Sequence, residues 1–177
     1  SRIDAATGYG EIAAMELESL RRQNPDNEQL YIQLISLYQR AGQLDEARRV
    51  ATLRTLQHPD SPGATCDLIS LLFETGAKDS AQRELDGYFT RYASDQRALM
   101  LIAGIAIRLE NPDLARQVRQ HAPQDEAGRV PLPFLFAELT TDCQAGAYAQ
   151  ALQTATVIDQ AGALSPAAQG SLFLMRC

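Results

Sequence analysis

Residues 28–61 read EQLYIQLISLYQRAGQLDEARRVATLRTLQHPDS, and the fold is decided by this stretch. Between residues 27 and 40 the apolar side chains recur at helical spacing, and Gly42 then interrupts the run. Glycine suits this place because it readily adopts the left-handed conformation that ends a helix. A second helical run covers residues 44–57, and Pro59 stops it because proline cannot continue a helix. The stretch therefore predicts two helices joined by a tight turn.

The same pattern recurs along the chain with a period of 34 residues. A glycine marks the turn, and an alanine follows five residues later, where two helices are expected to cross closely. A fixed period of this length indicates stacked helical repeats, each burying its apolar face against its neighbours. The repeating columns are Gly8, Gly42 and Gly76; Ala13, Ala47, Ala81 and Ala115; Pro25 and Pro59; Leu34, Leu68 and Ile102; and Tyr38, Leu72 and Ala106.

The later repeats depart from this pattern. Ala93 stands where the second unit should have its proline, and Glu110 replaces the turn glycine of the third. Gly146 lies 36 residues after Glu110, so residues 122–131 are expected to form a longer loop that shifts the register. The helices that follow are therefore placed by their own apolar spacing.

Ten helices are expected on these grounds. They cover residues 10–23, 28–40, 44–57, 62–75, 78–91, 95–109, 112–121, 132–144, 147–161 and 165–175. The expected core stripe of the eighth helix consists of Leu132, Leu135, Phe136, Leu139 and Cys143. Cys66 and Cys143 are both expected to be small buried hydrophobic residues.

The chain begins at Ser1, inside what reads as structured sequence. We therefore expect a single array cut from a longer protein. The expected division is a partial repeat at 1–27, full repeats at 28–61, 62–95, 96–130 and 131–164, and a second partial repeat at 165–177.

The unit at residues 28–61 resembles the tetratricopeptide repeat (TPR). The residues that stand at columns of the TPR pattern are Tyr31, Leu34, Tyr38, Gly42, Ala47 and Pro59. The resemblance covers nearly the whole chain, and it implies an all-α solenoid of antiparallel helix pairs in a right-handed superhelix. It also implies a non-catalytic scaffold that binds another protein or a peptide segment.

In the TPR family the first helices of the repeats line a groove that binds partners. The resemblance places these residues in that partner-binding groove: Ile32, Gln33, Ser36, Arg40, Ser70, Phe73, Glu74, Arg97, Ile107 and Arg108. Met100, Gly104, Phe136 and Thr140 continue the same rows. Apolar residues mixed with charges of both signs suit an extended peptide or an amphipathic helix better than a polyanion.

Composition narrows the function classes further. The 177 residues carry a net charge of −6, which would repel the phosphate backbone of a nucleic acid. Three cysteines and two histidines lie at no spacing typical of metal ligands, and no run of apolar residues is long enough to span a membrane. No phosphate-binding loop, zinc-protease motif or nucleophile motif is present. We therefore expect no enzyme, no cofactor and no metal.

The basic residues are fifteen arginines and the single Lys78. This usage, in repeats rich in alanine and glutamine, resembles the periplasmic TPR scaffolds of Gram-negative exopolysaccharide exporters (PelB-like). That resemblance implies a bacterial protein of biofilm export that docks a polysaccharide-modifying enzyme, in the periplasm or at the outer membrane. Otherwise a cytoplasmic location is expected. Two other functions stay open: an architectural spacer, and the sensor arm of a larger regulator or enzyme.

Overall fold

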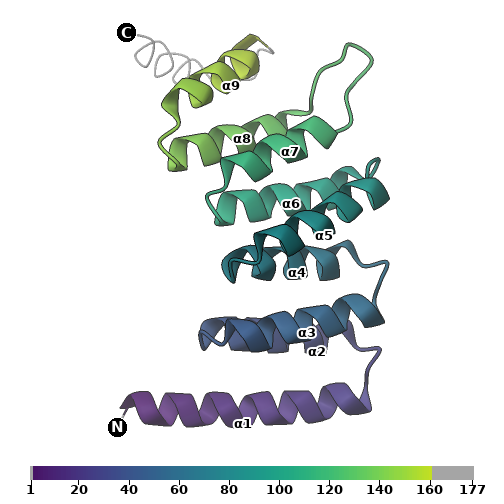
Figure 1. Ribbon diagram of the computed structural model, residues 1–177, viewed down its shortest axis with the longest axis vertical. Helices are drawn as coiled ribbons and strands as arrows, with labels where there is room; N and C mark the ends of the chain where they lie inside the picture. Colours follow the sequence, from purple (N-terminus) through teal and green to yellow (C-terminus); the bar gives the residue numbers. More distant parts are fainter. Residues whose placement is uncertain (1, 161–177) are drawn as a thin grey trace. The chain divides into compact units, whose positions relative to one another are not determined.

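The computed structural model describes the backbone of residues 2–160 and the side chains of residues 10–160. In this range the chain contains α-helices and no strand, as the repeat pattern predicts (Figure 1). The helix expected at 165–175 lies outside the described residues. The helices are α1 (Arg2–Gln23), α2 (Glu28–Arg40), α3 (Leu44–Gln57), α4 (Pro62–Glu74), α5 (Lys78–Arg91), α6 (Gln96–Arg108), α7 (Pro112–His121), α8 (Leu132–Gln144) and α9 (Tyr148–Gln160).

Local capping signals mark the starts of four of the described helices. The side chains of Asn27, Ser61, Asp95 and Asn111 accept hydrogen bonds from backbone N–H groups in the first turns of α2, α4, α6 and α7. These caps satisfy N–H groups that have no partner inside the helix. The predicted bounds of α2 to α9 agree with the observed ones to within one residue.

Helix α1 is longer than predicted. The recurring glycine column placed a turn near Gly8, but the helix runs from Arg2 through this position without a break. Each glycine inside a helix costs only about 1 kcal/mol relative to alanine, so the rest of this 22-residue helix can continue through Gly8 and Gly10. The expected start at residue 10 is therefore wrong.

The turns between paired helices share one backbone conformation. Gly42, Gly76 and Gly146 have φ values of 72°, 75° and 71°. Glu110 occupies the same place between α6 and α7 with a φ of 49°, in the left-handed region that side chains disfavour. The turn geometry is thus kept even where the glycine is lost.

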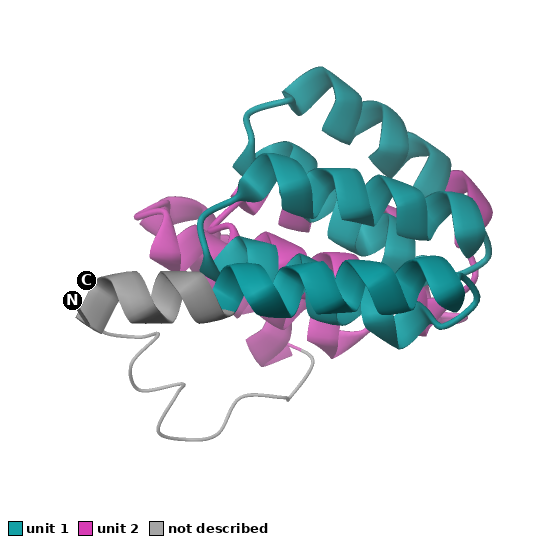
Figure 2. Cartoon of the chain, turned by 90° about the horizontal axis from the view of Figure 1, so that it is seen from below, with its two compact units in different colours: residues 1–88 teal, residues 89–177 magenta. Residues whose placement is uncertain are grey.

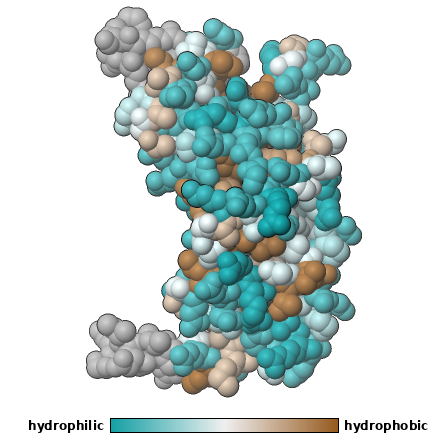
Figure 3. Space-filling view, in the orientation of Figure 1, coloured by the Kyte–Doolittle hydropathy of each residue, from teal (hydrophilic) through white to brown (hydrophobic). Residues whose placement is uncertain are grey.

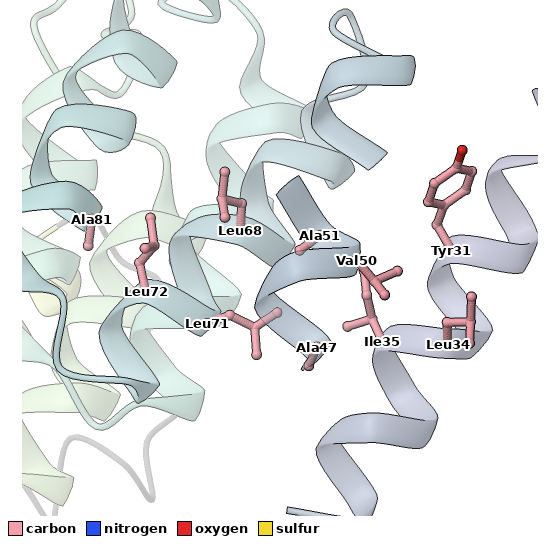
Figure 4. Packing of buried hydrophobic residues seen from close by; sticks show 10 residues of the cluster. All are labelled: Tyr31, Leu34, Ile35, Ala47, Val50, Ala51, Leu68, Leu71, Leu72 and Ala81. Carbon is pink, nitrogen blue, oxygen red and sulfur yellow. The ribbon is translucent and has the colours of Figure 1, made fainter. Parts of the chain in front are cut away.

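The chain divides into two compact units, residues 1–88 and residues 89–177 (Figure 2). In the first unit, α3 packs between α2 and α4, and the alanines predicted at close crossings, Ala47 and Ala81, are fully buried. Figure 4 shows Ala47, Val50 and Ala51 of α3 among larger side chains of the neighbouring helices. The core cluster consists of Tyr31, Leu34, Ile35, Ala47, Val50, Ala51, Leu68, Leu71, Leu72 and Ala81.

In the second unit, α7 packs against both α6 and α8, α6 packs against α8, and α9 packs against α8. Phe89 stacks on His121 with ring centroids 4.0 Å apart. The large buried side chains of this unit include Leu99, Ile102, Leu114, Val118, Phe134, Leu135 and Ile158.

The buried face of α8 differs from the predicted stripe. Leu135 is buried as expected, but Phe136 and Cys143 are exposed. The buried positions include Glu138 and Asp142, which pair with arginines of α7. An apolar pattern cannot identify a buried face that carries two acids, which is why the core-stripe expectation for Phe136 and Cys143 is wrong. The exposure of Phe136 agrees with its other expected place, on the groove rows. Cys66 is buried, as expected.

Candidate partner-binding surfaces

The predicted groove residues of the first unit lie on α2 and α4. On α2, the side chains of Ile32, Gln33, Ser36 and Arg40 are exposed, and the Arg40 Nε donates a hydrogen bond to the Ser36 carbonyl oxygen at 3.2 Å. This face of α2 is therefore open to a partner.

The predicted groove residues on α4 are less exposed than those on α2. Ser70 is buried, and Phe73 and Glu74 are half-buried. Phe73 packs against the core cluster of the unit, so core packing accounts for much of its apolar surface. The Ser70 hydroxyl donates to Glu74 Oε1 at 3.0 Å, and Gln39 Nε2 of α2 donates to Glu74 Oε2 at 3.4 Å. Glu74 thereby links α2 to α4, a role that the sequence pattern did not indicate.

In the second unit the predicted groove residues lie on α6. Arg97 and Arg108, near its two ends, are exposed, and Ile107 is half-buried. The exposed apolar residues on α6 are Met100 and Leu101, and Gly104 is exposed beside them. A Cβ atom built on Gly104 would meet no atom within 4 Å, so the surface is open there.

Helix α8 presents an equivalent row. Helices α6 and α8 each contain 13 residues and begin 36 residues apart, at Gln96 and Leu132. Met100 and Phe136 therefore occupy the same helical position, as do Gly104 and Thr140. Phe136, Thr140 and Cys143 are all exposed. Because α6 packs against α8, these rows form adjacent exposed faces of two neighbouring helices, which we call the α6–α8 face.

A buried ionic network holds the helices of the first unit in place. The guanidinium of Arg54, on α3, donates to Glu28 Oε1 of α2 at 3.1 and 2.8 Å, and it also pairs with Asp67 of α4. The Ser61 hydroxyl donates to the same Glu28 oxygen at 2.6 Å. The hydrogen bond from Ser61, together with the Arg54 charge, outweighs partial burial and lowers the pKa of Glu28.

A second network lies beside a cleft between α1 and the α2–α3 turn. The cleft has a volume of about 1030 Å³ and includes Met15, Tyr38 and Arg40 in its lining. Glu18 accepts hydrogen bonds from Arg21 and Arg49. Burial alone would raise the pKa of Glu18, but these two arginines hold it below the usual value. The charges of Glu18 and Arg49 are thus largely compensated within the protein.

The ionic contacts of the second unit are less complete. Arg116 Nη2 donates to Asp142 Oδ1 at 3.1 Å, while the other carboxylate oxygen of Asp142 is buried without a hydrogen-bond partner among the described residues. Arg119 Nε lies 2.9 Å from Glu138 Oε2, but the pair lacks the geometry of a hydrogen bond. Burial raises the pKa of Glu138, with the neighbouring Asp142 acting in the same direction against the arginine charges.

Neither a metal site nor a membrane crossing is found among the described residues. No group of three or more His, Cys, Asp and Glu side chains in this range could hold a metal ion. No helix in it has both the length and the apolar character needed to cross a bilayer. Burial raises the pKa of the Cys66 thiol to about 12, and that thiol donates to the Tyr88 hydroxyl at 3.2 Å.

Sequence reasoning missed the charged residues that join the helices: Glu28, Arg54, Asp67, Glu138 and Asp142. A charged residue at a core-facing helical position is the available signal, and Glu138 and Asp142 show it by lying among the apolar positions of α8. The signal is weak, because the same spacing also occurs on exposed faces.

Comparison with known proteins agrees with this architecture. Residues 12–64 match the family model described as tetratricopeptide repeat. A crystal structure of a tetratricopeptide repeat protein from Parabacteroides merdae is similar over 97% of this chain and 69% of that one, with a TM-score of 0.55 and 19% sequence identity. No curated protein matches the sequence. Residues 12–64 therefore match the tetratricopeptide repeat family, and the chain has the all-α helix-pair fold of tetratricopeptide repeat proteins.

Proposed function

We propose that this chain is a non-catalytic scaffold that binds a segment of another protein on the exposed faces of its first helices. These faces belong to α2 in the first unit and to α6 and α8 in the second. The proposal includes the predicted groove residues, among them Ile32, Arg40 and Arg97.

One observation carries the proposal. On α6 and α8, Met100, Leu101 and Phe136 remain exposed on adjacent helices, although the unit has a well-buried core beneath them. Apolar side chains that gather on neighbouring elements mark interaction surfaces more often than isolated ones do. The side of the molecule shown in Figure 3 is mostly hydrophilic, with small hydrophobic patches.

The fold supports binding by presenting these side chains on fixed helices. In the first unit, Arg54 links α3 to α2 and α4. A surface that is already ordered costs less conformational entropy on association than a flexible one. The chain would therefore act by presenting a preformed surface, and the partner segment would lose most of the freedom.

Site-specific photo-crosslinking tests the proposal. Benzoylphenylalanine is placed at Ile32, at Phe136 or, as the matched control, at Leu56, an apolar residue of α3 that is 70% exposed. We expect a partner to be captured at Ile32, at Phe136 or at both positions, and not at Leu56. The captured protein is then purified, and its affinity should fall with Ile32→Ser or Phe136→Ser but not with Leu56→Ser. Capture only at Leu56, or affinities unchanged by the first-helix variants, would instead favour a spacer role.

A narrower form of the proposal places the scaffold in bacterial exopolysaccharide export, docking a polysaccharide-modifying enzyme. Its support is the arginine-rich, lysine-poor composition of the repeats. Deleting the segment that encodes residues 28–160 in the source organism should then lower secreted exopolysaccharide. Normal secretion by the deletion strain would restrict the proposal to its general form.

A further inference from the structure

The α6–α8 face has an unusual charge pattern for this protein. Helix α6 contains no acidic residue, and the two acids of α8, Glu138 and Asp142, are only 4% and 0% exposed. The exposed charges of the face are therefore Arg97 and Arg108. In a chain with a net charge of −6, this face is cationic and neither of its helices exposes a carboxylate, while the exposed acids Asp95 and Glu110 stand just beyond the two ends of α6.

Between the two arginines the face is apolar. Met100, Leu101 and Phe136 are 36%, 46% and 40% exposed. Thr140 donates its hydroxyl to the Phe136 carbonyl oxygen at 2.7 Å. Its polar group is therefore already satisfied within α8, which leaves the methyl group as its main contribution to a contact. The open surface over Gly104 leaves room for an incoming side chain.

The spacing of the charges limits the shape of a complementary ligand. Arg97 and Arg108 are eleven residues apart on α6, which corresponds to about 16 Å along one side of the helix. A ligand helix of about three turns spans this distance with its apolar residues on one face. Acidic residues near both of its ends would then meet the two guanidinium groups.

We infer that the α6–α8 face is the docking site for an acidic amphipathic helix of another protein. This inference rests on the proposed scaffold function and names the chemistry of the partner. An anionic membrane would also attract arginines, but stable electrostatic attachment to such a surface needs a cluster of about four to eight basic residues. This face offers two.

The test uses the whole chain and two synthetic helices of about 18 residues as probes. The probes share one leucine-rich face and differ only in carrying glutamate or lysine at every polar position. Fluorescence anisotropy should show the acidic probe binding at least about tenfold more tightly than the basic one, with an affinity that falls as salt is added. Equal binding of the two probes would overturn the inference.

Matched variants locate the binding. We expect Arg97→Glu and Phe136→Ser each to lower the affinity for the acidic probe about tenfold. The control variants Lys78→Glu on α5 and Val157→Ser on α9 should change this affinity less than about twofold. A glutamate at position 97 lies in the first turn of α6, where a negative charge is favourable, so that variant should fold. Equal losses in the two control variants would overturn the inference.

Cys143 supplies a second measurement. In a Cys177→Ser background, Cys143 is exposed and Cys66 is buried with a raised thiol pKa, so alkylation reports on the α6–α8 face. The acidic probe should slow alkylation of Cys143. Unchanged alkylation under saturating probe, or binding to vesicles of equal parts phosphatidylcholine and phosphatidylglycerol in preference to the probe, would overturn the inference.

The outcomes separate this inference from the proposed function. If Ile32→Ser abolishes binding of the acidic probe and Phe136→Ser does not, the scaffold function stands and the assignment of the docking site to the α6–α8 face fails. If photo-crosslinking at both first-helix positions also fails to capture a partner, the proposed function fails with it.

Discussion

The two units bury charge in different ways. Among the described side chains of the first unit, each buried charge has two partners of opposite sign: Arg54 pairs with Glu28 and Asp67, and Glu18 pairs with Arg21 and Arg49. Among residues 89–160 of the second unit, the buried charges are two acids on one helix, four residues apart, and each retains a buried oxygen without a hydrogen bond to any described residue.

On physical grounds, burying a charge should stabilise a helix stack only when its hydrogen-bonding groups are satisfied. A buried ion recovers its desolvation cost through good geometry and additional hydrogen bonds. The satisfied acids Glu18 and Glu28 have lowered pKa values, while the incompletely satisfied Glu138 has a raised one. The first network should therefore stabilise its unit. The second should stabilise its unit less, so that a substitution can raise the stability there.

Removing the buried cation should have the largest effect. We expect Arg54→Met to lower the free energy of unfolding by about 3 kcal/mol, because Glu28 and Asp67 lose their shared partner. Urea denaturation followed by circular dichroism measures the change. The matched control is Arg48→Met on the same helix, which loses an ion pair with the exposed Asp45 and a hydrogen bond to Thr75, and it should cost less than about 1 kcal/mol. Equal losses of unfolding free energy in the two variants would show that the buried network stabilises the protein no more than the exposed ion pair does.

Neutralising one buried acid in each unit should give effects of opposite sign. At about pH 7, Glu18→Gln should destabilise the protein by about 1 kcal/mol because two arginines lose their charged acceptor. Glu138→Gln should stabilise it by a similar amount, about 1 kcal/mol, since it ends the like-charge contact with Asp142. Glutamine four residues before aspartate can also donate to the unpartnered Asp142 oxygen. Urea melts of the two variants decide this, and destabilisation by Glu138→Gln would mean that the Arg119 contact dominates.

The stability of Glu18→Gln and Glu138→Gln relative to the parent should also depend on pH, in a different way for each variant. The folded pKa of Glu138 is raised, so its destabilising charge is present at neutral pH and is lost as the pH falls through that value. The advantage of Glu138→Gln should therefore shrink on acidification towards the ordinary glutamate pKa of about 4.5. Glu18 has a lowered pKa, so its contribution persists to this pH and is lost below it. Urea melts of both variants across this pH range should show these opposite trends.

The smallest effects concern the turns. Gly76→Ala places a side chain at a φ of 75° and should cost about 1 kcal/mol. Glu110→Gly relieves the strain at a φ of 49° but adds freedom to the unfolded chain, so a net gain of about 0.5 kcal/mol is expected. Thermal melts compare the two variants with the parent. A loss of stability in Glu110→Gly would show that the Glu110 side chain makes a compensating contact.

The helices could be predicted because their ends depend on nearby residues. Ser61 caps α4 through a residue only three positions away, and Gly42 takes its positive φ wherever the chain turns there. The turn predicted near Gly8 is absent, because a glycine allows a turn conformation but does not by itself end a helix. The division of the chain into repeats 28–61, 62–95, 96–130 and 131–164 stays a prediction.

The candidate surfaces were predicted less completely. The family resemblance places Arg97, Arg108 and Ser70 on the groove rows, and both arginines are exposed but Ser70 is buried. Phe136 was expected both in a core stripe and on the groove rows, and only the packed helices decide that it is exposed. The partners of Arg54 come from 26 residues before it and 13 residues after it, on two other helices. No local pattern states which arginine will meet which acid.

The sequence by itself determined where helices α2 to α9 begin and end and that Ala47 and Ala81 are buried between helices. These features depend on backbone conformation, capping and side-chain volume, all of which are local. Only the tertiary structure decided which faces stay exposed and which charges are buried. Burial depends on atoms brought in from distant helices, and a charge is tolerated inside a protein only where such atoms supply its partners.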